Sequence, residues 1–326
     1  MVMAEIKAEK MATRQAYGKT LVELGKTTPH LVVMDADLSK STMTAEFGKA
    51  YPERFFNMGI AEQNLYGTAC GLALAGKVVC ASTFAMFAAG RAFEIIRNSI
   101  GYTHANVKIC ATHAGITVGE DGASHQTFED LALMRTIPGM TVLNPSDGVS
   151  AAALIKQAVA FDGPAYIRLG RAAVPTFYTE EMAAKLEIGK AVCLRTGDKK
   201  DGKPADATII ATGIMVNEAM LAAAELAADG IEVRVIDMHT IKPLDADIIY
   251  RAARETGAIV TAEEHSVIGG LGSAVAEVTA THCPVKMAMV GQQDTFGESG
   301  KPDELKVKYG MTAADIVRAV KQLIEA

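Results

Sequence analysis

Residues 59–64 place a carboxylate, Glu62, where a short strand-like segment at 55–58 meets a helical segment of mostly small and apolar residues at 65–76. A carboxylate at this junction can interact favourably with the positive end of a helix. It can also be a catalytic acid with little water around it, because a helix this apolar is not typical of a protein surface. Considered alone, the stretch favours the first interpretation, since most carboxylates at helix starts are caps or dipole partners.

The loop at 112–126 has the most reactive side chains and follows an apolar, strand-like run at 107–112. It carries two histidines, His113 and His125, together with Glu120, Asp121 and several glycines. Glycine permits tight backbone turns, and histidine carries protons near neutral pH. Taken alone, the loop is equally consistent with a functional site and with a surface loop that holds incidental polar residues.

Other candidate residues have ordinary explanations when taken one at a time. Asp35 and Asp37 follow a strand at 31–34, where an Asx turn is common. Arginines bind phosphate through a planar guanidinium, but a lone arginine is usually solvated; the candidates are Arg14, Arg168 and Arg171. Phe84 and Phe87 point the same way from a helical turn, for which core packing is the better explanation.

The second half of the chain offers weaker signals. Residues 269–274 resemble a nucleotide-binding loop only loosely, because the third glycine of the dinucleotide fingerprint is missing. His239 and His265 could be polar loop residues.

Composition limits the classes of function. The chain has 326 residues, 49% of them hydrophobic, and a net charge of −6. An acidic balance argues against nucleic acid and against an anionic membrane surface as partners. Five scattered cysteines without Cys-x-x-Cys, and histidines without ligand spacing, argue against a metal site on this chain. With no signal peptide and no apolar run long enough to span a membrane, we expect a soluble, reduced, cytoplasmic protein.

Strand-like and helical segments alternate along most of the chain. Strands are expected at 31–34, 55–58, 78–83, 107–112, 141–143, 165–169, 207–212, 232–236, 258–261 and 285–290, and helices at 12–24, 65–76, 91–99, 147–160, 215–228, 245–255, 270–280 and 312–325. The helix at 12–24 is expected to be capped by Thr13 and Gly25, and the helix at 147–160 by Ser146.

This alternation predicts an α/β protein with two domains, each a mostly parallel sheet covered by helices. An irregular segment at 175–204 sets the boundary near residue 190, which gives domains 1–190 and 191–326. Functional loops should follow strand ends, as the loops at 35–42, 84–91, 113–126 and 168–171 do.

Taken together, the motifs resemble the C-terminal half of a transketolase in order and spacing. The matching stretches are Ala-Thr-Arg at 12–14, Asp-Ala-Asp-Leu at 35–38, Gly-Ile-Ala-Glu-Gln-Asn at 59–64, Thr-Phe at 83–84, Gly-Glu-Asp-Gly-Ala-Ser-His-Gln at 119–126 and the segment 168–175. The resemblance covers nearly the whole chain. It implies a pyrimidine-binding domain of a thiamine-diphosphate enzyme at 1–190, followed by the transketolase C-terminal domain at 191–326.

A full transketolase also has a diphosphate-binding domain, whose Gly-Asp-Gly motif and downstream Asn hold Mg²⁺ and thiamine diphosphate. Gly-Asp-Gly does not occur here, and the length leaves no room for a third domain. The resemblance therefore implies the second subunit of a split transketolase, which shares thiamine diphosphate with an N-terminal subunit that supplies the Mg²⁺ ligands. A homodimer or an α2β2 assembly is expected, with sugar phosphates as substrates.

The resemblance also implies roles for single residues. Glu62 matches the glutamate that bonds N1′ of the cofactor's aminopyrimidine and favours its imino tautomer, so that the amine can take the proton from thiazolium C2. Gly90 stands where transketolases often have a further aromatic residue. The other implied roles are contact with the pyrimidine ring for Phe84 and Phe87, an acid near the cofactor for Asp37, sugar contact and catalysis for His113 and His125, sugar contact for Asp121, and binding of the sugar phosphate for Arg14, Ser41, His113 and Arg171.

Three alternatives remain at this point. The β subunit of a 2-oxo acid dehydrogenase (an E1 beta-type subunit) shares the architecture, length and cofactor, but the 119–126 loop with Arg14 and Arg171 suits phosphosugars better than a short oxo acid. Deoxyxylulose-phosphate synthase has a similar loop, but it normally fuses all three domains. The chain could also be a subunit with no activity of its own. The sequence does not identify the sugar pair.

Overall fold

The apolar runs in the first half of the chain become the strands of a seven-stranded sheet. The computed structural model describes residues 9–199 and 201–325. Within them the sheet has the order β12-β6-β7-β5-β4-β2-β3, parallel throughout except for the pair β12 and β6. Its strands are β2 (Leu31–Asp35), β3 (Phe55–Asn57), β4 (Val78–Phe84), β5 (Val107–Thr112), β6 (Thr141–Leu143), β7 (Ala165–Arg168) and β12 (Thr240–Lys242). Strands covered on both faces are expected to be continuously apolar, and β4 and β5 are buried along their whole length.

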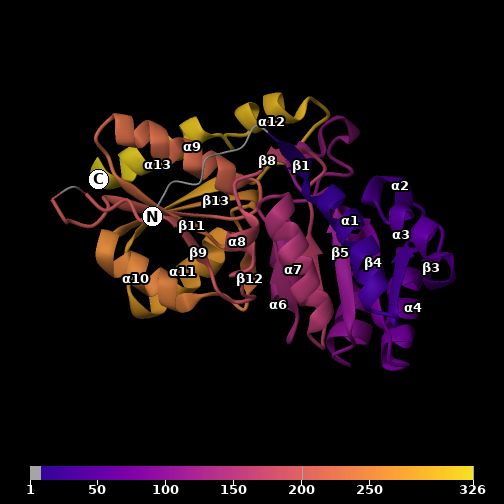
Figure 1. Cartoon of the computed structure of the whole chain (residues 1–326). Helices are drawn as coiled ribbons and strands as arrows, with labels where there is room; N and C mark the ends of the chain where they lie inside the picture. The colour runs from indigo at the N-terminus through magenta and orange to yellow at the C-terminus, as the bar shows by residue number, and fades with distance from the viewer. Residues whose placement is uncertain (1–8, 200, 326) are drawn as a thin grey trace.

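Helices cover both faces of this sheet (Figure 1). We call the sheet together with these helices the first domain. On one face pack α1 (Thr13–Thr27), α3 (Ala45–Ala50) and α7 (Gly148–Ala160). On the other face pack α4 (Glu62–Leu74), α5 (Phe93–Ile95), α6 (Asp130–Thr136) and the π-helical turn η3 (Ile96–Gly101). A second π-helical turn, η2 (Phe87–Arg91), and a 3-10 helix, η4 (Ile116–Asp121), follow β4 and β5. Between β2 and β3 lie α2 (Ser39–Thr42) and the 3-10 turn η1 (Pro52–Arg54).

The second domain repeats the architecture on a five-stranded sheet in the order β14-β13-β10-β11-β9. Its strands are β9 (Val192–Arg195), β10 (Ala207–Ala211), β11 (Val233–Asp237), β13 (Ala258–Ser266) and β14 (Lys286–Gln292). α9 (Met215–Ala228) and α13 (Ala313–Glu325) cover one face, and α10 (Ala246–Thr256) and α11 (Leu271–His282) cover the other. α12 (Pro302–Lys308) lies above the first domain's η4, where Gly119 closely approaches the Pro302 ring (Figure 1). The predicted α/β architecture with two mostly parallel sheets is confirmed.

The segment 175–204 is more ordered than predicted. It begins at the last residue of β8 (Ala173–Pro175), a strand that pairs with β1 (Lys10–Ala12). The segment then contains the short helix α8 (Glu180–Ala183) and the edge strand β9. Short edge strands with polar flanks have only a weak hydrophobic pattern, which explains why the sequence predicts an irregular segment here. The strand β12 was also missed, and it joins the first domain's sheet although it follows residue 190. The boundary near residue 190 stays a prediction.

Three predicted caps are wrong. Ala12, not Thr13, is the N-cap of α1, and Thr13 instead accepts a hydrogen bond from the Gly170 amide at 2.8 Å. α1 continues past Gly25 to Thr27. The N-cap of α7 is Asp147 rather than Ser146, because the Asp147 carboxylate accepts from the Ser150 amide. Each residue type suits a cap, so composition alone did not identify the one used.

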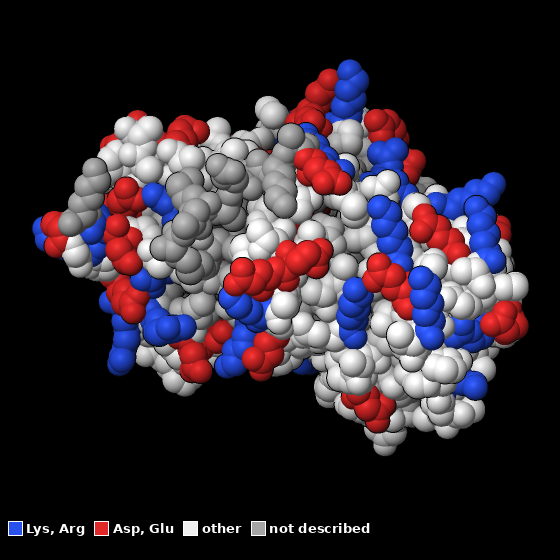
Figure 2. All heavy atoms as spheres, viewed as in Figure 1, with Lys and Arg blue, Asp and Glu red and all other residues white. Residues whose placement is uncertain are grey.

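Lysines and arginines alternate with acidic side chains over the face seen in Figure 2, without a large patch of one sign. Among the described residues, no helix is both long and apolar enough to cross a membrane. Within the same residues, no cluster of three or more His, Cys, Asp and Glu side chains could hold a metal ion.

Candidate active site

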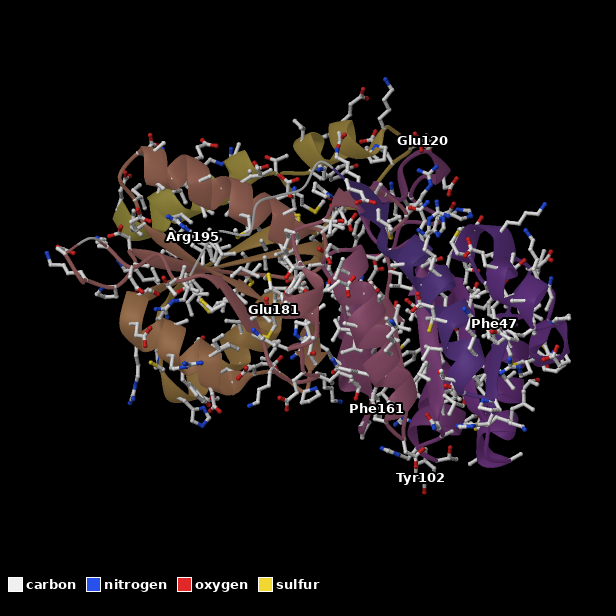
Figure 3. All side chains as sticks on the ribbon, viewed as in Figure 1. Phe47, Tyr102, Glu120, Phe161, Glu181 and Arg195 are labelled. Carbon is white, nitrogen blue, oxygen red and sulfur yellow. The ribbon has the colours of Figure 1, made fainter. Side chains whose placement is uncertain are left out.

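The parallel sheet brings the predicted functional loops to one edge. β7, β5, β4 and β2 are successive neighbours, so their carboxyl ends meet there, and ligands of open α/β sheets bind at such an edge. Three of the site residues that the resemblance implies lie outside the loops that follow these strands: Glu62 starts α4, Arg14 lies on α1, and Phe84 is the last residue of β4. The loops themselves carry Asp37, Ser41, Phe87, His113, Asp121, His125 and Arg171. Glu120, in the loop after β5, lies at this end of the first domain beside α12, and Tyr102 lies at the opposite end (Figure 3).

Glu62 is the first residue of α4, and its side chain is 3% exposed. Its carboxylate lies 3.4 Å from the guanidinium of Arg91, a side chain that is 56% exposed. In the described part of the chain, no backbone amide of α4 donates to this carboxylate, and the N-cap residue Ala61 makes no side-chain cap. A buried carboxylate normally needs hydrogen bonds, and the helix start does not supply them. Glu62 therefore forms no capping hydrogen bond, although it lies in the first turn of α4, where a carboxylate interacts favourably with the helix dipole.

The expectation that α4 is not a surface helix is only partly right. Leu65 and Tyr66 are fully buried, but the opposite face, with Gln63 and Leu74, is exposed. A Cβ added at Gly67 or at Gly71 would meet open space. The apolar composition thus reflects both a core face and an exposed face of small side chains.

Four rings form a cluster beside the strand ends. Phe84 ends β4, and its ring stacks on that of His113 with centroids 3.9 Å apart. Phe87 lies 6.0 Å from Phe84, and the His125 ring meets Phe87 edge-on at 5.4 Å. The Arg91 guanidinium, the partner of Glu62, lies 5.4 Å from the Phe87 centroid. Arg91 thus contacts both the aromatic cluster and the buried carboxylate, which places Phe87 close to Glu62.

His113 is held neutral. It is buried in a left-handed backbone conformation (φ 59°), and its Nδ1 is 2.8 Å from the Thr112 hydroxyl. Burial lowers the pKa of His113 to about 3, and the nearby charges of Arg14 and Arg171 add to the shift. The expectation that this histidine carries protons near neutral pH is wrong. It can still donate or accept a single hydrogen bond.

Arg14 and Arg171 converge from α1 and the loop after β7. Arg14 donates from Nη1 to the Ser41 carbonyl at 2.6 Å and from Nε to the Arg171 carbonyl at 3.3 Å. Arg171 donates from Nη1 to the carbonyl of Val118 at 3.0 Å and to the Glu120 carboxylate at 2.9 Å. Burial and the neighbouring Arg171 charge lower the pKa of Arg14. Two close, partly buried guanidiniums favour an anion between them.

Arg168 has a structural role instead. It is buried and donates to both carboxylate oxygens of Asp130, at 2.8 Å and 3.2 Å, and to the Glu264 carbonyl at 2.9 Å. Its suggested role in binding phosphate is therefore wrong. No local sequence pattern indicates this burial, because its partners Asp130 and Glu264 are distant along the chain.

Two predicted residues stand apart from these contacts. Asp37 is exposed and exchanges hydrogen bonds with Asn57, each 3.0 Å. Asp121 is exposed in the loop after β5. Within the described residues, no hydrogen bond or ion pair joins either aspartate to Glu62 or to the arginines. The adjacent Asp35 is buried and accepts from Leu38, Thr42 and Thr44, as expected of a turn residue.

The glycine-rich segment at 269–272 does not offer a free site for a nucleotide phosphate, because a carboxylate of the same chain occupies its amides. The amides of Leu271 and Gly272, at the start of α11, donate to the carboxylate of Glu263 at 2.6 Å and 2.7 Å. His239 and His265 are both fully buried rather than in polar loops, and His265 lies on β13. Sequence reasoning missed the contacts of Arg91 and Glu264 with the site. The contact of Arg91 with the site could have been inferred, because Arg91 lies in the predicted functional loop at 84–91. No such indication exists for Glu264.

Comparison with known proteins agrees with this geometry. Residues 9–176 match the family "Transketolase, pyrimidine binding domain", and residues 198–316 match "Transketolase, C-terminal domain". A transketolase C-terminal section from Methanocaldococcus jannaschii is 49% identical over 98% of both chains. The 6-deoxy-6-sulfo-D-fructose transketolase subunit SqwH from Clostridium sp. is 43% identical over 98% of this chain and 97% of its own.

A solved structure described as "Split gene transketolase, inactive beta4 tetramer" is 55% identical to this chain. It aligns with a TM-score of 0.88 over 97% of this chain and 99% of the other. The fold, both domain families and these full-length matches agree with the resemblance that the motifs indicated. The chain therefore belongs to the transketolase family and corresponds to the C-terminal section of a split transketolase.

Proposed function

We propose that this chain is the C-terminal subunit of a thiamine-diphosphate-dependent transketolase. With a separate N-terminal subunit, it transfers a two-carbon ketol unit from a ketose phosphate to an aldose phosphate. The observation that carries the proposal is the buried Glu62 carboxylate, which its own helix leaves without amide partners, beside the ring cluster of Phe84 and Phe87. Such a carboxylate suits a ligand nitrogen in a site with little water.

The residues present fit one end of thiamine diphosphate. Glu62 would bond a ring nitrogen of the aminopyrimidine, Phe84 and Phe87 would contact its ring, and Asp37 would lie near the cofactor. When bound, the cofactor acts as an electron sink for carbon–carbon bond cleavage. We assign the diphosphate and the Mg²⁺ ligands to the N-terminal subunit, as the family resemblance implies.

The sugar end is built from the loop after β5 and the two arginines. Arg14 and Arg171 would hold the terminal anion of the sugar, together with Ser41 of α2, whose carbonyl accepts from Arg14. His113 would give one hydrogen bond as a neutral ring, because burial and then the charges of the two arginines lower its pKa. His125 and Asp121 would contact the sugar hydroxyls. His125 is the partly exposed histidine of the ring cluster and the better candidate for moving a proton.

The arginine pair suits either a phosphate or a sulfonate. SqwH is named for a sulfosugar, and a guanidinium binds both anions through two parallel hydrogen bonds. Phosphate carries a higher negative charge than sulfonate at neutral pH. Because the two adjacent guanidiniums repel each other, the more highly charged anion stabilises the pair more. We therefore assign a sugar phosphate, and the sulfosugar is one arm of the test.

The test is reconstitution with the chain that carries Gly-Asp-Gly and the downstream Asn. Ketol transfer is measured with each subunit alone and with both, using phosphosugar pairs, a sulfosugar donor, and pyruvate with detection of CO₂. We expect transfer only with both subunits and with phosphosugars, in keeping with the solved relative that is described as an inactive β4 tetramer. Robust transfer by this chain alone would refute the split-subunit proposal, and release of CO₂ from pyruvate would favour the 2-oxo acid dehydrogenase.

A further inference from the structure

The loop that carries His113 and His125 rests on the second domain. The Gln126 side chain donates to the Glu298 carbonyl at 2.9 Å. Three glycines allow close approach along the same contact: Gly297 against the Gln126 side chain, Gly122 against Ser299 and Gly119 against Pro302. The loop that we assign to the sugar is thus shaped on its far side by residues 297–302.

Glu264, from β13 of the second domain, lies under the start of this loop. Its side chain is buried, and its Oε1 accepts from the Thr117 amide at 2.7 Å. A Cβ added at Gly115, where φ is +81°, would lie 2.3 Å from the Glu264 carboxyl carbon. The Arg168 guanidinium lies 3.9 Å from the other carboxylate oxygen. An amide bonded to a buried carboxylate is among the stronger hydrogen bonds in proteins.

The neighbouring Glu263 provides an internal comparison. It is also buried on β13, but its carboxylate accepts from the amides of Leu271 and Gly272 at the start of α11. Its hydrogen bonds therefore stay within the second domain, whereas the Thr117 amide that bonds Glu264 belongs to the first. Two adjacent glutamates of β13 thus accept hydrogen bonds from amides of different domains.

Other strand ends of the second domain also face the first. The His239 carbonyl, after β11, accepts from the Asn144 amide at 2.9 Å, and the Asp237 carboxylate accepts from Ser146 at 2.7 Å. The carboxyl ends of parallel strands are where open α/β sheets bind ligands. Here the first domain covers much of that edge, so the polar groups at the strand ends of the second domain bind residues of the first domain instead of a ligand.

We propose that Glu264 is a positioning residue for the sugar site, and that the second domain acts as the template on which the loop at 113–126 is held. The proposal rests on the proposed function, because the loop is assigned to the sugar there. The contacts of Glu264 are with protein groups, the Thr117 amide and Arg168. It fixes the Thr117 amide and, with it, the loop between His113 and His125. Glu62 lies on α4, which has no part in this contact, so the cofactor end does not depend on Glu264.

The first measurement does not need enzymatic activity. Hydrogen–deuterium exchange of the full chain is followed over residues 113–126 in wild type, Glu264→Gln and Glu263→Gln. Gln keeps the size of Glu but removes the charge from the hydrogen bond. We expect exchange in the loop to rise by about tenfold in Glu264→Gln and to stay within about twofold of wild type in Glu263→Gln. Gly115→Ala, which disturbs the contact from the loop side, should reproduce the effect of Glu264→Gln.

The second measurement uses the reconstituted two-chain enzyme. Glu264→Gln should raise the KM for the sugar phosphate by about tenfold and leave the apparent Kd for thiamine diphosphate within about twofold. A general loss of stability would move both constants, and Glu263→Gln controls for it. Unchanged loop exchange in both Glu264→Gln and Gly115→Ala would overturn the proposal, as would faster exchange with an unchanged KM. If the wild-type complex shows no ketol transfer, the proposed function fails, while exchange still decides whether Glu264 holds the loop.

Discussion

Glu62→Gln separates a catalytic carboxylate from a structural one, because a structural role predicts a clear loss of stability and a catalytic role predicts almost none. A capping glutamate would stabilise α4, and its neutralisation would destabilise the fold. The structure shows a different situation: the carboxylate is buried and takes no amide from its helix, and its ionic partner Arg91 is largely exposed at 3.4 Å. Gln has the same shape, so the change removes one buried charge and one weak ion pair.

The magnitudes follow from those contacts. An ion pair with an exposed partner contributes at most about 1 kcal/mol, and neutralising a poorly bonded buried carboxylate works in the opposite direction. The melting temperature should therefore change by no more than about 3 °C in either direction. Ketol transfer by the reconstituted enzyme should fall by roughly 10²–10⁴-fold, the usual contribution of a positioned acid or base.

The assay pairs thermal unfolding of the isolated chain with ketol transfer by the complex. Glu53→Gln is the matched control, since Glu53 also forms an ion pair with a neighbouring arginine but lies on η1, away from the site. Its stability and turnover should both stay near those of wild type. Near-normal turnover in Glu62→Gln would refute its catalytic role. A drop in melting temperature of about 8 °C or more would show instead that the carboxylate is a structural group.

Three further outcomes are expected. Arg171→Ala should raise the KM for the phosphosugar by about 10- to 100-fold with little change in cofactor binding, because a charged contact to the phosphate is lost. The ring of His113 should show no protonation by NMR between pH 8 and pH 5, since burial lowers its pKa to about 3; a midpoint above pH 5 would contradict this. Burial raises the pKa of Asp237 to about 7, above its unfolded value, so its contribution to stability is lost as pH rises from about 4 to about 7. Asp237→Asn should remove the part of this loss that falls between pH 5 and pH 8, about 3 kcal/mol, in unfolding curves measured at those two pH values.

Controls for these variants come from exposed residues of the same types. Arg97 is exposed near the end opposite the sugar loop, and Arg97→Ala should leave the KM for the phosphosugar unchanged. Asp247 is exposed in the first turn of α10, and Asp247→Asn should keep the wild-type dependence of stability on pH. A wild-type stability that does not fall between pH 5 and pH 8 would contradict the prediction for Asp237.

The sequence predicted the fold well where the pattern was long and regular. The strands β4 and β5 and the helices α7 and α9 lie close to their predicted positions. Continuous apolar runs mark these strands and helical periodicity marks these helices, and each signal persists over several residues. It failed for β9 and β12, which are short edge strands whose pairing depends on residues far along the chain. The cap of α7 was misplaced by one residue, since Ser146 and Asp147 are both good capping types.

The site was predictable from the sequence only in part. The loops after β2, β4, β5 and β7 followed from topology, and the grouping of Arg14 with Arg171 came from the family resemblance. The electrostatic state of His113 was not predictable, because its pKa depends on burial and on arginines from α1 and the loop after β7. The burial of Arg168 and the contact of Glu264 with the loop required the packing of the two domains, which no local pattern records.

The two ends of the candidate site therefore depend on different parts of the molecule. Glu62 is placed by α4 and the sheet of the first domain alone, whereas the loop at 113–126 is held between that sheet and Glu264 of the second domain. Relatives that act on different sugars can share the same cofactor end when the sugar loop has its own support. If the loop selects the sugar as we propose, the second domain is the surface against which that loop is held. Changes at the domain contact should then alter the preferred sugar and leave the proposed role of Glu62 intact.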